Sequence, residues 1–199
     1  MPYKDSINKM MSTVIGFATN TLNRKQPEGP LGNFIADAMK LMAERKFEKK
    51  IDAAVMNPGG IRSYIGKGNI TIGKMFELIP FDNQLVLQQM NGAALHRFLD
   101  HAASKGGWAV AGITMAIRDS KADSIMISGK PIGENETYLI ALPDYVANGG
   151  DDAEMLRGIP VITKGYLLRD ALVEYIQEIT KQGKAVSASL ENRVRNAEQ

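Results

Sequence analysis

Residues 57–62, with the sequence NPGGIR, place a cation directly after a turn that carries almost no side chains. They follow the apolar run 53–56, which predicts a buried strand. Glycines in such a turn leave backbone N–H groups open to an anion and let a ligand approach the main chain. Arg62 adds a planar, permanently charged guanidinium that suits phosphate or carboxylate. The segment predicts one wall of a binding site, although an ordinary turn with a solvated arginine would have the same sequence.

Two further polar loops each carry one aromatic residue, Phe81 in the loop 80–83 and Tyr145 in the loop 144–152. Two rings on separate loops could hold a flat heterocycle between them, since stacking on a base contributes about 1 to 3 kcal/mol. The alternative is that Phe81 fills the core and Tyr145 packs against a helix. Nearby residues of the same loops that can form hydrogen bonds are Asn83 and Asp151.

The two histidines give little basis for metal catalysis. His96 and His101 lie five residues apart in a predicted helix, so their side chains point in different directions. A binuclear hydrolase needs roughly six to eight ligands, which two scattered histidines do not supply. The chain has no cysteine, and no serine lies in a Gly-x-Ser-x-Gly motif. We therefore predict no metal site and no catalytic residue in this chain, and a structural or surface role for both histidines.

The composition fits one globular domain that spans residues 1–199. With 44% of its 199 residues hydrophobic, the chain can bury a sizeable core. Charged residues make up 23% and the net charge is +2, which argues against nucleic acid as a partner. No segment approaches about eighteen consecutive apolar residues, so we expect no transmembrane helix. The first residues also lack the apolar stretch of a secretory signal.

The periodicity of apolar residues predicts interleaved helices and strands. The expected helices cover residues 5–13, 31–42, 72–78, a segment after Asn91-Gly92, and 166–182. The expected strands cover residues 14–22, 53–56, 84–90, 112–118, 124–128 and 138–142. Because the strands between residues 112 and 142 follow one another through short turns, a layered α+β domain fits better than a doubly wound parallel sheet.

Four motifs, in their order and spacing, resemble the C-terminal domain of the 5'-nucleotidase family. The resemblance extends from about residue 14 to residue 194, and it implies that family's fold, a layered α/β/β/α sandwich. The motifs are Glu28-x-x-Leu31-Gly32-Asn33-Phe34-Ile35-Ala36-Asp37-Ala38, Asn57-x-Gly59-Gly60-Ile61-Arg62, Pro80-Phe81-x-Asn83, and Tyr145 with Asn148-Gly149-Gly150-Asp151.

The resemblance implies a nucleotide-recognition domain. In that family an aromatic residue from each of two loops clamps the base, which assigns Phe81 and Tyr145 to this role. Arg62 and a basic residue upstream of the first helix, Lys25 or Arg24, would contact the phosphate side. The remaining matches are Asn57 at the start of the turn, Asn83 after the clamp phenylalanine, and Asp151, which would hold the ribose hydroxyls.

Three residues depart from the family pattern. Pro58 replaces a glycine and removes a backbone N–H from the turn. Tyr145 stands where phenylalanine is common, and it adds a hydroxyl. Asp152 follows Asp151 where glycine is frequent, so we expect the shape or the charge of this loop to differ.

The combination of D-x-H, G-D and G-N-H-[ED] motifs that marks the family's metallophosphoesterase domain does not occur. The resemblance therefore implies that a separate metallophosphoesterase domain or protein, with two divalent metal ions, supplies catalysis for a nucleotide or nucleoside bound here. The alternatives are a stand-alone, non-catalytic nucleotide-binding module and a relic that has kept the fold and lost the ligand. The family acts mostly outside the cytoplasm, which favours a periplasmic or cell-surface location.

Overall fold

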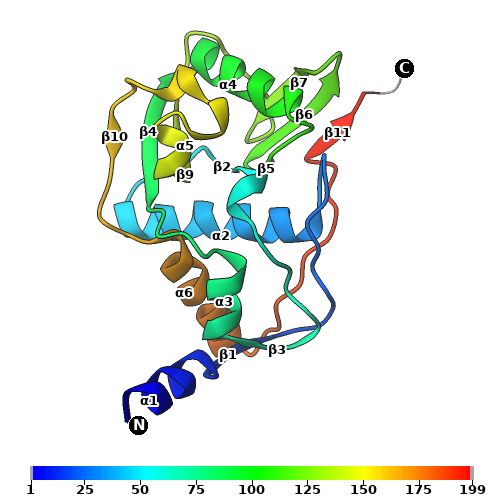
Figure 1. The fold of residues 1–199 in the computed structure, drawn as a ribbon. Helices are drawn as coiled ribbons and strands as arrows, with labels where there is room; N and C mark the ends of the chain where they lie inside the picture. Colours follow the sequence, from blue (N-terminus) through cyan, green and yellow to red (C-terminus); the bar gives the residue numbers. More distant parts are fainter. Residues whose placement is uncertain (1, 198–199) are drawn as a thin grey trace.

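The centre of the fold consists of three neighbouring strands, β4 (Leu85–Asn91), β9 (Thr137–Pro143) and β2 (Ala53–Met56). In the computed structural model, which describes residues 2–197, β9 runs parallel to β2 and antiparallel to β4. Residues 1, 198 and 199 of the predicted single domain lie outside the described residues. The five-stranded sheet is completed by β10 (Val161–Ile162) beside β4 and β5 (Ala109–Ala111) beside β2 (Figure 1).

Alternate residues of the central strands are buried on opposite faces, because successive side chains of a strand point to opposite sides of a sheet. In β2, Ala54 and Met56 belong to one hydrophobic core, whereas Ala53 and Val55 belong to another. All four residues are fully buried, so both faces of the sheet are covered. A strand in this position is expected to be a continuous apolar run, as residues 53–56 are.

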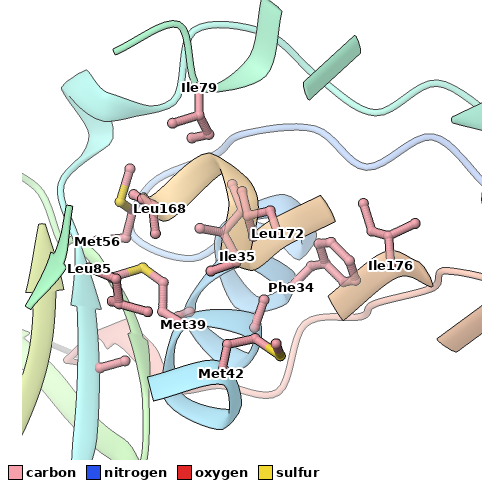
Figure 2. Packing of buried hydrophobic residues seen from close by; sticks show 14 of the residues in the cluster. Phe34, Ile35, Met39, Met42, Met56, Ile79, Leu85, Leu168, Leu172 and Ile176 are labelled. Atoms are coloured by element: carbon pink, nitrogen blue, oxygen red, sulfur yellow. The ribbon is translucent and has the colours of Figure 1, made fainter. Parts of the chain in front are cut away.

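One face of the sheet is covered by α2 (Pro30–Phe47), and α6 (Leu168–Lys181) packs against α2 (Figure 1). Pro30 occupies the first turn of α2, where its missing N–H would have no partner within the helix. The apolar stripe predicted for α2 is buried between the sheet and α6. Figure 2 shows the side chains that meet there, from α2 (Phe34, Ile35, Met39, Met42), α6 (Leu168, Leu172, Ile176) and the sheet (Met56, Leu85).

The other face of the sheet is covered by α4 (Gly92–Ser104), which also packs against the predicted hairpin of β6 (Ile113–Arg118) and β7 (Lys121–Ile127). The chain passes from β5 into this hairpin at Gly112, which has a φ of 77°. A Cβ at this position would lie 2.2 Å from the carbonyl oxygen of Asp52, so a side chain has no room there. A four-stranded sheet is completed by β8 (Lys130–Pro131) beside β7 and β11 (Val194–Asn196) beside β6.

The α+β class predicted from the sequence is confirmed, and the contacts refine the order of its layers. The expected α/β/β/α sandwich has its two sheets facing each other. In the structure, one buried face of α4 packs against β4 and β9 of the five-stranded sheet and against β7 of the four-stranded sheet, so α4 joins the two sheets in one hydrophobic core. The physical reason is the bend between β5 and β6, which folds the hairpin over α4.

The remaining elements at the N-terminal end are α1 (Pro2–Met11), β1 (Val14–Ala18), β3 (Gly68–Thr71) and α3 (Ile72–Leu78) (Figure 1). The strand predicted over 14–22 ends at Ala18, and Leu22 forms one isolated bridge with Ile65. The sequence analysis does not predict five short strands, because runs of two to four residues are too short to show a period; these are β3, β5, β8, β10 and β11. Within residues 2–197, no helix combines the length and the apolar character needed to cross a membrane.

The first family motif ties the C-terminal segment of the chain to the start of α2. The Oε1 atom of Glu28 accepts hydrogen bonds from the side chain of Asn33, at 2.6 Å, and from the backbone N–H of Glu191, at 2.8 Å. Asn33, which is 2% exposed, also donates to the carbonyl of Ser189 at 2.9 Å. These contacts give Glu28 and Asn33 a structural role, and neither residue lines the cavity formed by the loops 57–62, 80–83 and 144–152.

Arg193→Leu is expected to lower the free energy of unfolding by about 1 to 3 kcal/mol. The buried guanidinium of Arg193 donates to both carboxylate oxygens of Asp37, at 2.7 and 2.8 Å, and to the carbonyl of Val110 at 3.0 Å. Because Asp37 stays partly solvated, the cost is below that of a fully buried ion pair. Urea denaturation followed by circular dichroism measures the loss. The control is Arg195→Leu at an exposed position of β11, two residues after Arg193, and an equal loss in both variants would contradict the prediction.

Candidate functional site

The three loops that the sequence predicts as a binding site meet at one edge of the five-stranded sheet. β2 and β9 are parallel, so both end at this edge, and the antiparallel β4 begins there. The turn 57–62 follows β2, the loop 144–152 follows β9, and the loop 80–83 precedes β4. Together they line a cavity of about 280 Å³, close to the lower end of the volumes of small-molecule sites. Its lining residues are Asn57, Gly59, Gly60, Arg62, Phe81, Asn83, Tyr145 and Asp151.

The cavity contains both predicted aromatic residues. The Phe81 and Tyr145 side chains are 44% and 47% exposed, and neither belongs to a hydrophobic core. The alternative in which Phe81 fills the core is therefore wrong. Large aromatic side chains are usually mostly buried, so two exposed rings at the mouth of one cavity indicate surfaces for a flat ligand.

Arg62 lies beside one of these rings, with its guanidinium carbon 6.0 Å from the centroid of the Phe81 ring. The turn before it is a short 3-10 helix over Pro58–Gly60, a position at which proline loses no hydrogen bond. Arg24 donates to the carbonyls of Pro58 and Ile61, at 2.9 and 2.8 Å, and so holds the turn. The site therefore combines a ring and a cation on adjacent loops.

The two basic residues that the resemblance implies for the phosphate side, Arg24 and Lys25, precede α2 and do not line the cavity. Arg24 is engaged by the carbonyls of the turn. Lys25 is exposed and absent from the cavity lining, so the other six predicted site residues converge and Lys25 does not.

Asp151 is the most constrained residue of the site. Its Oδ2 atom accepts a hydrogen bond from the side chain of Asn57 at 2.6 Å, and its Oδ1 atom accepts one from the Tyr145 hydroxyl at 3.1 Å. Its backbone has a φ of 53°, in the left-handed region that aspartate tolerates better than most residues. Its carbonyl lies 2.8 Å from Nε2 of His101, which must donate this hydrogen bond because a carbonyl oxygen can only accept.

Asp152 does not form an acid and base pair with its neighbour. It is exposed, and its carboxylate lies 2.8 Å from the ammonium group of Lys105. The hydrogen bond and the positive charge of Lys105 hold the pKa of Asp152 below its ordinary value. The φ of 62° at Asp152 also explains why a glycine would fit this position without strain.

The Tyr145 ring fixes the shape of the loop that follows it. A Cβ on Gly150 would lie 2.5 Å from ring atoms of Tyr145, so any side chain at this position would displace the ring. The glycine allows the backbone of the loop to pass directly over the ring. The position of the aromatic surface therefore depends on a residue five positions away.

Two buried polar residues that the sequence analysis does not single out hold the other parts of the site. Gln88 on β4 donates to the carbonyls of residues 147, 156 and 159, at distances of 2.9 to 3.3 Å, and so fixes the loop 144–152. Arg169 on α6 donates to the carbonyl of Ile79 at 3.0 Å and to Asp82 at 2.6 Å. The sequence does offer a signal for the role of Arg169, because this arginine lies next to the apolar stripe of the predicted helix. Gln88 lies within an apolar run, and the sequence gives no signal of its role.

The described residues do not form a metal site. Between residues 2 and 197, no group of three or more His, Asp or Glu side chains lies in an arrangement that could hold a metal ion. His96 is exposed and 3.9 Å from Asp100, and His101 contacts the loop of Asp151. Since His101 packs edge-on to Trp108, with centroids 5.7 Å apart, its role is to support the site.

Residues 13–158 match the family model described as 5'-nucleotidase, C-terminal domain. The chain belongs to the 5'-nucleotidase family. The resemblance drawn from the four motifs is therefore confirmed, and these motifs contribute both the cavity and the contacts of Glu28 and Asn33.

Relatives of this 5'-nucleotidase C-terminal domain are longer proteins. A 5'-nucleotidase of Vibrio vulnificus is 34% identical over an aligned length of 146 positions, and the alignment covers 70% of this chain and 26% of that protein. The trifunctional nucleotide phosphoesterase protein YfkN of Bacillus subtilis is 28% identical over an aligned length of 218 positions, gaps included, and the alignment covers 97% of this chain and 14% of that protein. The domain thus spans about a quarter or less of these curated relatives. The crystal structure of a 5'-nucleotidase precursor from Thermus thermophilus matches with a TM-score of 0.87 and 26% identity, over 100% of this chain and 42% of that chain.

Arg169→Met is expected to loosen the loop 80–83 of this 5'-nucleotidase C-terminal domain. The amide of Leu168 donates to the carbonyl of Asn83 at 2.9 Å, so its hydrogen exchange should become faster by about tenfold or more when the loop opens locally. Hydrogen–deuterium exchange measured by NMR tests this. In the control Asp82→Asn, the carbonyl contacts of Arg169 remain and the lost carboxylate is 78% exposed, so little change is expected. Equal exchange rates in the two variants would contradict the prediction.

Proposed function

We propose that this domain binds the nucleoside part and the phosphate end of a nucleotide for a 5'-nucleotidase or UDP-sugar hydrolase system. The observation that carries the proposal is that two exposed aromatic rings, a guanidinium and a tightly held carboxylate line the same cavity. Aromatic faces suit a base, a guanidinium suits a phosphate, and a carboxylate accepts hydrogen bonds from sugar hydroxyls. These are the three chemical parts of a nucleotide.

Each residue has a role in the proposal. Phe81 and Tyr145 hold the base, and Arg62 beside Phe81 contacts the phosphate end. Asn83 lines the cavity near Phe81 and forms hydrogen bonds with polar groups of the base. Asp151, oriented by Asn57, accepts hydrogen bonds from the ribose hydroxyls.

An unpaired acceptor supports the presence of a ligand. The Oδ1 atom of Asn57 is buried and has no hydrogen-bond partner among the described residues. An unpaired buried acceptor costs about 1 to 3 kcal/mol, a cost that a ligand donor would offset. Because Asn57 lines the cavity, a rotation of its amide brings Oδ1 to a hydroxyl or amino group of a bound nucleoside, which supplies this donor.

We place hydrolysis of the phosphoester outside the described residues. Two divalent metal ions would require ligands that residues 2–197 do not bring together, so in this proposal a metallophosphoesterase domain or partner protein holds both ions. The length of the relatives, of which this chain covers 26% or less in the two cases above, leaves room for such a domain. The second candidate is a stand-alone nucleotide-binding module, and a metallophosphoesterase encoded next to this chain would favour the split enzyme.

A periplasmic or cell-surface location is part of the proposal. Its support is the kinship with UshA, since Protein UshA of Yersinia enterocolitica is 31% identical over 147 residues. A relative from Listeria monocytogenes, 26% identical over an aligned length of 208 positions, gaps included, is named a cell wall protein. Fractionation of the native organism with an antibody against this chain tests the location.

Calorimetric titration with adenosine and AMP tests the binding function. Phe81→Ala is expected to weaken the binding of both ligands by about tenfold or more, because it removes one stacking surface. Arg62→Ala is expected to weaken AMP by about 5- to 20-fold and adenosine by less than about twofold, since only AMP carries the phosphate. Phe17→Ala is the matched control, because Phe17 is 47% exposed and lies on β1, outside the cavity lining.

The proposal also predicts almost no hydrolysis of AMP by this chain alone, with Mn²⁺, Zn²⁺ or Co²⁺ added. Robust phosphate release by the purified chain would overturn the proposal that this domain binds the nucleotide while another domain or protein hydrolyses it. An absence of heat with adenosine, AMP and UDP-sugars would overturn the binding function and favour a relic that has kept the fold.

A further inference from the structure

The hydroxyl of Tyr145 forms two hydrogen bonds with a single residue of the cavity. It donates to the Oδ1 atom of Asp151 at 3.1 Å and accepts from the backbone N–H of Asp151 at 3.2 Å. A phenylalanine at this position would provide the same ring and neither bond. The hydroxyl therefore links the aromatic surface of the cavity to its carboxylate.

Asp151 is held from two further directions. Asn57 donates to Oδ2 at 2.6 Å, and His101 donates to the backbone carbonyl at 2.8 Å. The left-handed backbone of Asp151, with a φ of 53°, is unfavourable for a residue with a side chain and persists where surrounding contacts determine it. Contacts from the turn after β2 and from α5 (Asp144–Ala147) hold the carboxylate, and the contact from α4 holds the backbone, so the carboxylate has a fixed direction.

The two protein donors leave a defined pair of acceptor positions on the carboxylate. An ionised carboxylate has about four lone-pair sites on its two oxygens. Asn57 occupies one site of Oδ2 and Tyr145 occupies one site of Oδ1, so each oxygen keeps one site for a ligand. Two free sites on neighbouring oxygens match two hydroxyl groups on adjacent carbon atoms, which is the arrangement of the 2′ and 3′ hydroxyls of ribose.

We infer that the Tyr145 hydroxyl is a positioning group that orients the Asp151 carboxylate toward a vicinal diol and so makes the site selective for ribonucleosides over 2′-deoxyribonucleosides. The inference rests on the proposed function. Without the hydroxyl, Oδ1 loses its donor and the carboxylate rotates about its last bond, held by Asn57 through one oxygen. A diol that binds both oxygens then has to order the carboxylate, which costs binding free energy. A single hydroxyl binds one oxygen and does not require this ordering.

Titration of the intact chain and of Tyr145→Phe with adenosine and 2′-deoxyadenosine tests the inference. The wild-type chain is expected to prefer adenosine by about tenfold or more, because the deoxy ligand leaves one charged acceptor site unpaired. Tyr145→Phe is expected to weaken adenosine about five- to tenfold and 2′-deoxyadenosine by less than about twofold, so that most of the preference disappears. Tyr64→Phe is the matched control, since it removes the hydroxyl of a tyrosine that is 52% exposed and outside the cavity lining.

A second variant separates positioning from a general loss of structure. Asp151→Asn keeps the size of the side chain and removes its charge, and it is expected to abolish the preference for adenosine. Adding Tyr145→Phe to Asp151→Asn should then change the ratio of the two affinities by less than about twofold, because the two groups act as one unit. Thermal unfolding of each variant shows that the comparison is made on folded protein.

The outcomes distinguish this inference from the proposed function. Adenosine binding with an unchanged preference in Tyr145→Phe, or an equal loss for both ligands, would overturn the positioning role and leave the binding function standing. Absence of binding by the wild-type chain to either nucleoside would overturn both.

Discussion

The parallel pairing of β2 with β9, and the antiparallel pairing of β9 with β4, is the constraint on which the site depends. Ala53 lies opposite Ile140, and Leu87 lies opposite Ala141, so the three strands share one register across the centre of the sheet. A reversal of any one strand would carry its loop to the opposite edge. Segments separated by more than eighty residues therefore form one cavity because the sheet has this order of directions.

Within that frame, hydrogen bonds from side chains to loop carbonyls set the detailed shape of the site. Gln88, Arg169 and Arg24 each donate to carbonyls of a different loop. These carbonyls lie in loops and at the ends of short helices, where buried backbone groups require partners outside a regular ladder. The exposed rings and the carboxylate thus rest on a rigid base, which favours binding because little order has to be gained when a ligand arrives.

The sequence predicts most of the site and less of the fold around it. The residue types of the turn 57–62, of Phe81 and of Asp151 indicate ligand binding by their chemistry, and these residues line one cavity as expected. The contact of α4 with both sheets does not follow from the sequence, because apolar periodicity identifies a buried face without specifying which elements cover it. Lys25 shows the same difficulty, since its charge and its place in the chain suggest a ligand contact, and neither specifies the direction of a flexible side chain.

The contact between the start of α2 and the C-terminal segment has a consequence for the order of events on the ribosome. Asn33 and Ser189 are 156 residues apart, so at roughly 5 to 20 residues per second about 8 to 30 s separate their synthesis. During this interval Asn33 and Glu28 lack their final partners, and the apolar face of α2 waits for α6 to cover it. The face of α2 that α6 covers therefore stays exposed until residues 168–181 have been translated.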